Sequence, residues 1–398
     1  MRVTHVITRL IVGGAQENTV DSVLGLRSRH GLEVSLLSGP THGSEGSLAG
    51  AFADCPQALA IVPHLVRPVH PYHDWLALRE LTATLRRQQP DLVHTHSGKA
   101  GILGRFAAHR AGVPIIVHTI HGPSFGPFQG PLANGIFRAA ERQAARVTTH
   151  FVAVAHAMTR QYLAAGIGRP DQFTYVPSGF DLAPFLATKP DPALRERFGF
   201  APDDFVVAKL ARLAPLKGHR ELLVAAPELL REHPKTRFLL IGDGPERARL
   251  QKEIHERGLK RHFAFTGLVT PAQIPALLGI VDAVVHLSRR EGLPRALTQG
   301  LAAAKPVVAY DCDGAAQVCR SGETGYLVPV GHRSELMQRL GDLAANRPMA
   351  EQFGQRGREL VSAEFSVERM VDGLHTLYRQ LARDRSAAGS AGIPAGVW

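Results

Sequence analysis

Residues 205–217 of the chain have the sequence FVVAKLARLAPLK, in which strand-forming residues lead into a loop that holds Arg212 and Lys217. A second segment, SRREGLPRALTQG at residues 288–300, also follows an apolar run, and its helix is expected to begin near Pro294. Both segments are strand–loop–helix junctions. In parallel α/β sheets such junctions lie at the carboxyl ends of the strands, where ligands bind. The two segments therefore predict one shared pocket.

The charged residues of these loops indicate the chemistry of that pocket. Arg212 and Lys217 place two cations where a diphosphate can bind. The Glu291 carboxylate can accept hydrogen bonds from sugar hydroxyls. Together they predict a site for a nucleotide diphospho-sugar. A solvated surface can carry the same arginine and lysine, so the prediction depends on the order of the remaining motifs.

Length, charge and cysteine content narrow the class of protein. A chain of 398 residues is expected to form two domains. The three cysteines show neither disulfide nor metal-ligand spacing, which predicts reduced thiols in a cytoplasmic protein. The N-terminal segment predicts a first strand rather than a signal peptide, and no apolar run reaches the length of about 18 residues of a transmembrane helix. The net charge of +11 suits phosphorylated or anionic partners, whereas no nucleic-acid-binding signature is present.

Strand and helix patterns alternate along the chain, which is typical of βαβ units and parallel sheets. A proline-containing break at 184–192 separates two similar series. We therefore expect an α/β fold of two tandem Rossmann-like doubly wound domains that face each other across a ligand-binding cleft. The expected parts are a first domain at 1–185, a second at 186–365, a helix at 366–385 that can cross back to the first domain, and a disordered tail at 386–398. The expected strands are 2–8, 33–37, 92–96, 115–119, 151–154 and 173–176 in the first domain, and 205–210, 236–241, 262–266, 283–287 and 306–309 in the second.

Two strand ends in the first domain carry polar or glycine residues. Gly13 and Gly14 open a helix and let the backbone approach a phosphate, although they also fit an ordinary tight turn and form no dinucleotide fingerprint. The segment VHTHSGKAGILGR at 93–105 places two histidines and Lys99 at a strand end. Lys99 is interpreted as a phosphate or carboxylate contact or as a surface lysine. The segment offers no third and fourth ligands for a metal.

A third strand end carries His121, followed by a loop rich in glycine, proline and phenylalanine at 121–131. An imidazole there can hydrogen-bond a reacting sugar, or it can be structural. In the second domain, IGDGP at 241–245 predicts an open turn in which Asp243 caps a helix. FTGLV at 265–269 can leave backbone groups free to contact a base. Ordinary loop chemistry explains both segments equally well.

The ordered set GGA, HTHSGKAG, TIHG, VPSGFD, ARLAPLKG, IGDGP, FTG and REGLPRALTQG resembles glycosyltransferase family 4 over about residues 1–380. This resemblance implies the GT-B fold, with an acceptor-binding first domain and a donor-binding second domain. It implies a retaining hexosyltransferase that uses neither metal nor cofactor. The donor is expected to be a UDP-sugar, with GDP- and ADP-sugars as alternatives. The acceptor is expected to be a hydroxyl of a glycan or lipid-linked saccharide in cell-envelope or exopolysaccharide synthesis.

The resemblance also implies roles for single residues. Arg212 and Lys217 would bind the donor diphosphate and stabilise the leaving group, because fixed cations must take up its charge when no metal does so. His121 would contact the donor sugar near the reacting carbon. Glu291 matches the first glutamate of the family's EX7E motif, whereas Gln299 replaces the second and can bind ribose hydroxyls without a charge. Further donor contacts are expected from Gly14, Gly242, Asp243, Gly244, Gly267, Leu268, Val269, Ser288, Gly292, Leu293 and Pro294, and acceptor or phosphate contacts from Gly13, Gln16, His96, Ser97 and Lys99.

The sequence is also compatible with other functions. One is a GT-B protein that binds nucleotides or polyanions without turnover, and another is a sugar-nucleotide epimerase of similar fold that needs no acceptor. The basic charge, the arginines at 85–88 and the loop at 125–128 also predict contact with an anionic membrane from the cytoplasmic side. No motif specifies the acceptor, the linkage or an oligomeric state.

Overall fold

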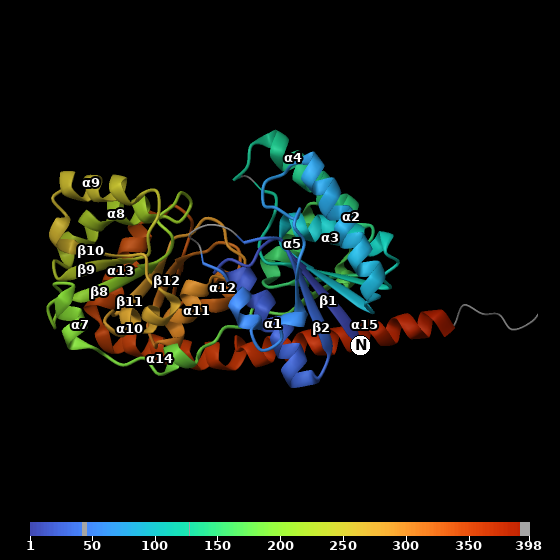
Figure 1. The fold of residues 1–398 in the computed structure, drawn as a ribbon. Coiled ribbons are helices and arrows are strands. Elements are labelled where there is room, and N and C mark those ends of the chain that lie inside the picture. Colours follow the sequence, from blue (N-terminus) through green and yellow to red (C-terminus); the bar gives the residue numbers. More distant parts are fainter. Residues whose placement is uncertain (42–45, 127, 391–398) are drawn as a thin grey trace, which may run out of the picture. The chain divides into compact units, whose positions relative to one another are not determined.

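The structure is a computed structural model that describes residues 1–41, 46–126 and 128–390. The chain forms two compact units: unit 1 comprises Met1–Gly179 and the C-terminal helix α15 (Val367–Ser390), and unit 2 comprises Phe180–Ser366. Each unit is a parallel sheet with helices on both faces (Figure 1). The predicted α/β fold of two doubly wound domains is therefore confirmed. The sequence predicts the boundary near residue 185, and the two units divide between Gly179 and Phe180.

The seven-stranded sheet of unit 1 has the order β3-β2-β1-β4-β5-β6-β7. The chain builds outward from β1 to one edge and then from β4 to the other, so the topological switch point lies between β1 and β4, where ligands bind in this kind of sheet. The strands are β1 (Arg2–Ile7), β2 (Glu33–Ser38), β3 (Leu59–Ile61), β4 (Leu92–His96), β5 (Ile115–Ile120), β6 (His150–Ala153) and β7 (Phe173–Tyr175).

Side-chain alternation along the strands divides the core of unit 1 into two layers. Val3 and Ile7 of β1 pack with α1 and α15, whereas Val6 points to the opposite face and packs with α2 and α3. Gly25 of α1 permits the close approach of α15, because a Cβ there would lie 2.5 Å from Val371. The helices of this unit besides α15 are α1 (Gly14–His30), α2 (Pro71–Gln88), α3 (Gly98–Arg110), α4 (Pro131–Ala145) and α5 (His156–Ala164).

The C-terminal helix is longer than the sequence pattern indicates. Residues 386–390 were predicted to belong to a disordered tail, but α15 continues through Ser390. Small residues such as Ser386 and Ala387 are compatible with a helix that has already begun, and no proline interrupts it there. Ser386 Oγ donates to the Ala382 carbonyl at 3.0 Å. The rest of the predicted tail lies outside the described residues.

The six-stranded sheet of unit 2 has the order β10-β9-β8-β11-β12-β13, which places its switch point between β8 and β11. The helices α8, α9 and α13 pack on one face, and α11 packs on the other, where Gly300 meets Val284. The strands are β8 (Phe205–Leu210), β9 (Thr236–Ile241), β10 (Phe263–Gly267), β11 (Ala283–His286), β12 (Val307–Tyr310) and β13 (Gly325–Val328). The helices are α6 (Ala183–Leu186), α7 (Pro192–Arg197), α8 (His219–Glu232), α9 (Arg247–Glu256), α10 (Ile274–Gly279), α11 (Arg295–Ala302), α12 (Ala315–Val318), α13 (Arg333–Ala345) and α14 (Arg347–Glu364).

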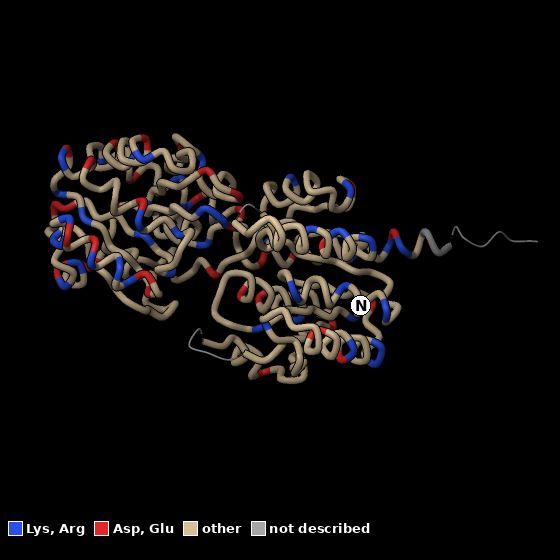
Figure 2. Tube along the Cα trace, turned by 90° about the horizontal axis from the view of Figure 1, so that it is seen from above, with Lys and Arg blue, Asp and Glu red and all other residues tan. Residues whose placement is uncertain are grey.

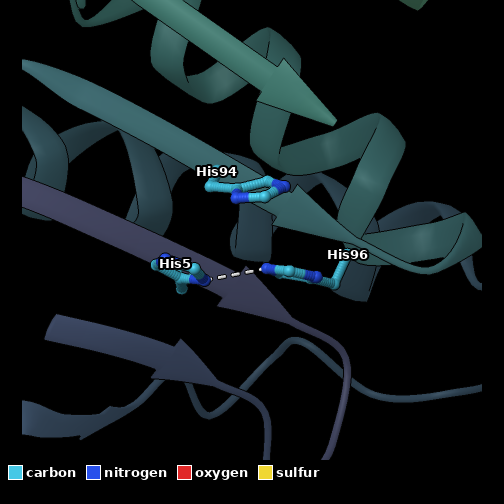
Figure 3. Close-up of side chains that lie close together, drawn as sticks. All are labelled: His5, His94 and His96. Atoms are coloured by element: carbon cyan, nitrogen blue, oxygen red, sulfur yellow. Dashed lines mark hydrogen bonds between the residues drawn. The ribbon is translucent and has the colours of Figure 1, made fainter. Parts of the chain in front are cut away.

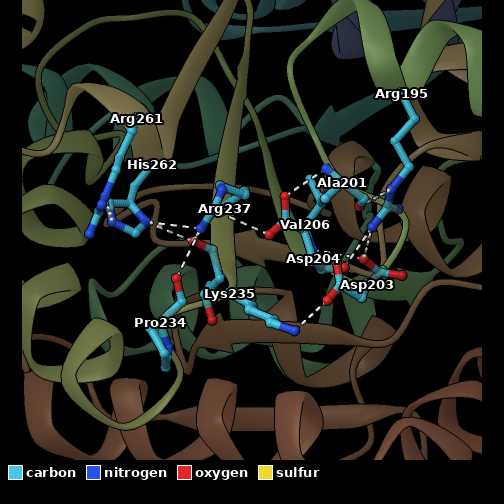
Figure 4. Close-up of polar contacts among 12 residues, drawn as sticks. Arg195, Ala201, Asp203, Asp204, Val206, Pro234, Lys235, Arg237, Arg261 and His262 are labelled. Atoms are coloured by element: carbon cyan, nitrogen blue, oxygen red, sulfur yellow. Dashed lines mark hydrogen bonds and ion pairs between the residues drawn. The ribbon is translucent and has the colours of Figure 1, made fainter.

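A hydrogen-bonded network closes the amino-terminal end of the unit 2 sheet (Figure 4). Arg237 of β9 lies 3.1 Å from the carboxylate of the buried residue Asp204. Asp204 Oδ2 also accepts from the Ala201 N–H at 2.7 Å, and Arg195 donates to the Asp204 carbonyl at 2.6 Å. The charges at this end stabilise the fold by pairing with one another. The candidate functional site is therefore expected at the opposite end, where the strands terminate.

A fully buried ion pair connects α3 with α4 in unit 1. Arg105 Nη2 lies 2.6 Å from Glu141 Oε2, and both side chains are 0% exposed. Replacing Glu141 by Gln would leave the guanidinium buried without its counter-charge, and we expect the free energy of unfolding to fall by about 3–5 kcal/mol in chemical denaturation.

The double substitution Arg105→Met with Glu141→Leu removes both charges and serves as the matched comparison. It is expected to lose less stability than Glu141→Gln alone, because no isolated charge remains buried. An equal or larger loss in the double variant would show that shape, rather than charge pairing, decides stability at this position.

Candidate functional site

The carboxyl ends of β8 and β11 bring Lys217, Ser288 and Glu291 together. Lys217 Nζ lies 2.7 Å from Glu291 Oε1 and 3.4 Å from Ser288 Oγ. The side chains of Lys217 and Glu291 are 32% and 21% exposed, so both charges remain accessible to a ligand. The loops are also joined by the backbone, since the Arg289 N–H donates to the Leu216 carbonyl at 2.9 Å. The two segments that the sequence assigns to one pocket thus meet at the switch point of unit 2.

Unusual backbone conformations hold these loops in place. Gly218 has φ +73°, and a Cβ there would lie 2.3 Å from the Leu287 carbonyl oxygen, so only glycine allows this approach. Leu216, Asp313 and Ser97 have φ between 51° and 68°, which is strained for residues other than glycine. They follow β8, β12 and β4, where the strands end. Strain of this kind is typical of functional loops.

Glu291 is held from three sides. Asp313 Oδ2 accepts a hydrogen bond from the Glu291 N–H at 2.7 Å, and His286 Nε2 lies 3.5 Å from Glu291 Oε1. Burial alone would raise the pKa of Glu291, but His286 and Lys217 more than offset it, and the pKa lies well below its usual range. Burial lowers the pKa of His286, although its contact with Glu291 acts in the opposite direction. Lys217 Nζ lies 2.7 Å from the same carboxylate oxygen.

Two buried residues beneath this pair were not identified from the sequence. Lys209 on β8 is 1% exposed, and its pKa is lowered to about 7 by burial and then by the charge of Lys217. His219, at the start of α8, is 2% exposed, and neither ring nitrogen has a hydrogen-bond partner among the described residues. The available signal was a lysine inside the otherwise apolar strand FVVAKL. A polar group at such a position is costly unless it serves a purpose.

The loop after β9 lies against the loop after β8. Cβ atoms at Gly242 and Gly244 would come within 2.4 Å of backbone oxygens of that loop, so both positions require glycine. Asp243 does not cap α9, whose N-cap is Glu246. Its two carboxylate oxygens are engaged elsewhere, since Oδ1 accepts from the Gly244 N–H at 2.8 Å and Oδ2 from the Arg247 side chain at 2.9 Å. Gly267, the last residue of β10, has φ +74°, and Leu268 after it is 79% exposed, with Val269 next in the chain.

The remaining predicted donor residues of unit 2 lie on the same junctions. Arg212 is exposed on the loop after β8. Gly292, Leu293 and Pro294 are buried in the turn that leads from Glu291 into α11. Gln299 lies inside α11 and is 3% exposed. The geometry keeps the amide of Gln299 within the packed part of the junction.

The predicted residues of unit 1 separate into two groups. Gly13 is the N-cap of α1, followed by Gly14 and Gln16, and a Cβ on Gly14 would meet nothing within 4 Å, so the start of α1 is open. Lys99 instead forms an ion pair with Asp74 of α2 and donates to the Pro68 carbonyl. This pairing supports a structural interpretation of Lys99. Ser97 is the N-cap of α3 but makes no side-chain capping hydrogen bond.

Buried histidines gather where β1 and β4 end in unit 1 (Figure 3). His5, His94 and His96 each offer a ring nitrogen, and these atoms lie within 4.8 Å of one another. The sequence around His94 and His96 contains no further metal ligand, because His5 comes from the neighbouring strand. His5 Nδ1 is hydrogen-bonded to His96 Nε2 at 2.8 Å, and His96 Nδ1 to His121 Nε2 at 2.9 Å. The predicted residues His96 and His121 are thus in direct contact.

Family models and solved structures that match this chain identify the class of protein. The model for Glycosyltransferase Family 4 matches residues 12–184, and the model for Glycosyl transferases group 1 matches residues 190–360. The crystal structure of Anabaena Alr3699/HepE in complex with UDP has a TM-score of 0.79 at 23% identity, and the match covers 96% of this chain and 100% of that one. Fold and family models together define a glycosyltransferase with the GT-B fold.

Relatives of known name agree with this class. The UDP-Gal:alpha-D-GlcNAc-diphosphoundecaprenol alpha-1,3-galactosyltransferase of Escherichia coli is 26% identical over 321 residues, which are 80% of this chain and 82% of that protein. The GDP-mannose-dependent alpha-(1-6)-phosphatidylinositol monomannoside mannosyltransferase of Mycolicibacterium smegmatis is 32% identical over 262 residues, which are 63% of this chain and 66% of that protein. The chain belongs to glycosyltransferase family 4.

The buried Lys209 predicts a pH dependence of stability. Its pKa is about 7 in the folded protein, below the ordinary value of 10.5 that applies to the unfolded chain. Between these two pH values the unfolded state binds more protons, so stability should rise as pH increases from 7 to 10. In Lys209→Met this rise, on the order of a few kcal/mol, should disappear.

Urea denaturation at pH 7 and at pH 9.5 gives the free energy of unfolding of the wild type and of Lys209→Met, and their difference at each pH measures the contribution of Lys209. Lys252→Met is the control, because the Lys252 side chain on α9 is 78% exposed. A difference between wild type and Lys209→Met that stays constant with pH would mean that Lys209 keeps its charge in the folded protein.

Proposed function

We propose that the protein is a retaining glycosyltransferase that transfers a hexose or N-acetylhexosamine from a UDP-sugar. The acceptor is a hydroxyl group of a glycan or lipid-linked saccharide in cell-envelope or exopolysaccharide synthesis. The observation that carries the proposal is the pair formed by Lys217 and Glu291, 2.7 Å apart at the switch point of unit 2. One accessible cation and one accessible carboxylate stand there side by side, as a diphosphate and a sugar hydroxyl require.

The proposed reaction follows from these charges. The bond between the anomeric carbon and the diphosphate oxygen breaks, and the nucleotide diphosphate leaves with the electron pair. The acceptor oxygen bonds to the anomeric carbon on the same face, and its proton passes to the departing diphosphate oxygen. Lys217 and Arg212 stabilise the charge that develops on the leaving oxygen, since fixed cations act most strongly where charge appears in the transition state. Glu291 holds a sugar hydroxyl, and His121 contacts the sugar near the reacting carbon.

The loops of unit 2 and the names of similar proteins support a nucleotide as the ligand of this unit. The turn at 242–244 packs against the loop that carries Arg212, and Leu268, which follows Gly267, is 79% exposed and can contact a base. UDP is the nucleotide in the complex of Alr3699/HepE, and the name of the Escherichia coli relative specifies UDP-Gal. The name of the mycobacterial relative specifies GDP-mannose, so GDP is the main alternative.

We also propose that unit 1 contacts an anionic membrane. Residues 111–137 contain no Lys, Arg, Asp or Glu, and long parts of unit 1 carry no charge (Figure 2). The start of α4 exposes Leu132 and Ile136, at 80% and 59%, and these lie one helical turn apart. Arg138 and Arg142 follow on the same helix. An exposed apolar turn next to arginines is typical of helices that lie at a membrane surface.

The structure changes the basis of the membrane hypothesis. Phe125, which the sequence suggested for this contact, is 7% exposed, and its ring centroid lies 5.2 Å from that of Tyr162. Its neighbour Pro127 lies outside the described residues. The described helices include none that is long and apolar enough to cross a membrane. Attachment would therefore occur at the surface, through α4.

Substitution of the two cations tests the transferase. Arg212→Ala and Lys217→Ala are each expected to reduce kcat with a UDP-sugar by about 10²–10³-fold, because each removes a charge that stabilises the leaving group. Lys252→Ala, an exposed lysine of unit 2, is the control and should keep full activity. Wild-type turnover in the double variant would rule out the proposed roles.

Thermal unfolding of the wild type and of these variants with UDP, GDP and ADP identifies which nucleotide the protein binds. A nucleotide present at about 100 times its Kd adds roughly 2.7 kcal/mol to the folded state. Stabilisation by UDP together with product formation supports the proposal. Stabilisation without any product in an acceptor screen supports a binding protein, and conversion of the sugar-nucleotide without acceptor supports an epimerase.

Sedimentation with vesicles of anionic lipid at low salt tests the membrane contact. The wild type is expected to sediment, and Leu132→Ser with Ile136→Ser should weaken binding because it removes the apolar contact, while basic residues contribute at most about 1 kcal/mol each. Val330→Ser, which alters an exposed residue of unit 2, is the control. A wild-type protein that stays in the supernatant at low salt would end the hypothesis.

A further inference from the structure

A continuous line of hydrogen bonds crosses the buried layer of unit 1 between the sheet and α15. At one end Thr119 Oγ1 lies 2.6 Å from His94 Nε2, and His94 Nδ1 is hydrogen-bonded to Tyr378 Oη. Tyr378 Oη lies 3.3 Å from His5 Nε2, and His5 Nδ1 lies 2.8 Å from His96 Nε2. The line ends where His96 Nδ1 meets His121 Nε2 at 2.9 Å. We call these six side chains the histidine chain.

Strand alternation explains why these residues meet. His5 shares a face of β1 with Val3 and Ile7, which pack toward α15. On β4, His94 and His96 follow Leu92 on the same face, and Thr119 follows Val117 on β5. Parallel pairing places His5 directly beside His94. Tyr378 of α15 then covers them and is 0% exposed.

The interior of the histidine chain is neutral. His5, His94 and His96 are at most 1% exposed, and burial lowers the pKa of each imidazole far below neutrality. Burial likewise lowers the pKa of His121 and raises that of Tyr378. A neutral imidazole has one N–H donor and one acceptor nitrogen, and a tyrosine hydroxyl donates one hydrogen. These groups can therefore all pair without any charge.

This requirement couples the members of the chain. If Thr119 donates to His94, then His94 must donate to Tyr378, Tyr378 to His5, His5 to His96 and His96 to His121. Reversing one hydrogen bond reverses all of them, because a Tyr378 hydroxyl that accepted from both imidazoles would leave its own hydrogen unpaired in this buried layer. In the first direction His121 carries its proton on Nδ1, and in the second on Nε2. The tautomer of His121 is thus tied to a hydroxyl group on the C-terminal helix.

We propose that Tyr378 is a positioning residue that acts through His5 and His96 to hold His121 in one orientation and one neutral tautomer. Because Nε2 of His121 is engaged by His96, the chain determines whether the remaining nitrogen, Nδ1, donates or accepts a hydrogen bond at the reacting sugar. The importance of a correct tautomer for a catalytic histidine is well established in other enzymes. The link to catalysis rests on the role proposed above for His121.

The same three imidazoles are close enough to be considered as metal ligands. However, all six ring nitrogens of His5, His94 and His96 take part in hydrogen bonds of the chain. A metal bound to one nitrogen of each would break at least two of these contacts. The geometry therefore favours the hydrogen-bonded chain over a metal site.

Tyr378→Phe tests the proposal, because it removes the hydroxyl and keeps the ring. Nitrogen NMR of the protein labelled with ¹⁵N-histidine reports the tautomer of each imidazole, and a His121→Asn spectrum assigns His121. The wild type is expected to show one tautomer of His121, and Tyr378→Phe a mixture of two. Tyr162→Phe is the matched control, since Tyr162 is also buried in unit 1 at 1% exposure but lies outside the chain.

The kinetic readout is separate from the spectrum. In Tyr378→Phe, kcat should fall by about 10-fold or more while KM for the donor changes little. Hydrogen-bond partners that orient metal-binding histidines typically have effects of this size. If transferase activity is absent from every variant, the proposed function fails, and the NMR result still decides whether the chain sets the tautomer. Unchanged His121 signals in Tyr378→Phe would refute the proposal, and so would altered signals with unchanged kcat.

Two further measurements complete the test. If Tyr378→Phe does not fold, Thr119→Val removes the hydroxyl at the other end of the chain with little change in shape, and the same mixture of His121 tautomers is expected. Elemental analysis of the purified wild type is expected to find no stoichiometric metal. One metal ion per chain that is lost in His5→Gln would replace the hydrogen-bonded chain by a metal site.

Discussion

Parallel strands impose the constraint on which both units depend, because all strands of a sheet end at the same edge. Each sheet also changes its direction of growth between two neighbouring strands, β1 and β4 in unit 1 and β8 and β11 in unit 2. The loops after such a pair lead to opposite faces of the sheet, and the backbone between them is left accessible. Lys217 and Glu291 lie after one pair, and Gly14 and Ser97 after the other. The opposite end of the unit 2 sheet is closed by Arg237 and Asp204, whose charges satisfy each other.

Much of this arrangement could be predicted from local sequence. Apolar runs such as VVAKL and AVV, each followed by a loop and a helical pattern, indicate buried parallel strands and place Arg212, Lys217 and Glu291 at their ends. Glycine positions were also informative, because the backbone contacts of Gly218, Gly242 and Gly244 exclude a side chain. The edge strands β3 and β13, which have three and four residues, were not predicted. Segments this short show no measurable periodicity.

The residues that tune the sites were harder to find, because their function depends on partners distant in the sequence. Asp313 binds the Glu291 N–H from the loop after β12, and His5 meets His96 across two strands. No spacing rule connects Tyr378 with His94, which lies 284 positions earlier. Lys209 was the exception, since a lysine within an apolar strand is visible in the sequence itself. Its surroundings, and hence its lowered pKa, become clear only once Lys217 and Glu291 are placed.

The position of α15 has a consequence for how the chain is made. Met370, Val371, Leu374 and Tyr378 complete the core of unit 1, yet the ribosome produces them after the whole of unit 2. Unit 2 is encoded without interruption and can fold as soon as it emerges. The nascent unit 1, although synthesised first, keeps an apolar face exposed to water until α15 has left the ribosome. The first half of the protein is therefore the last to be finished, and it is the half that requires protection from aggregation during synthesis.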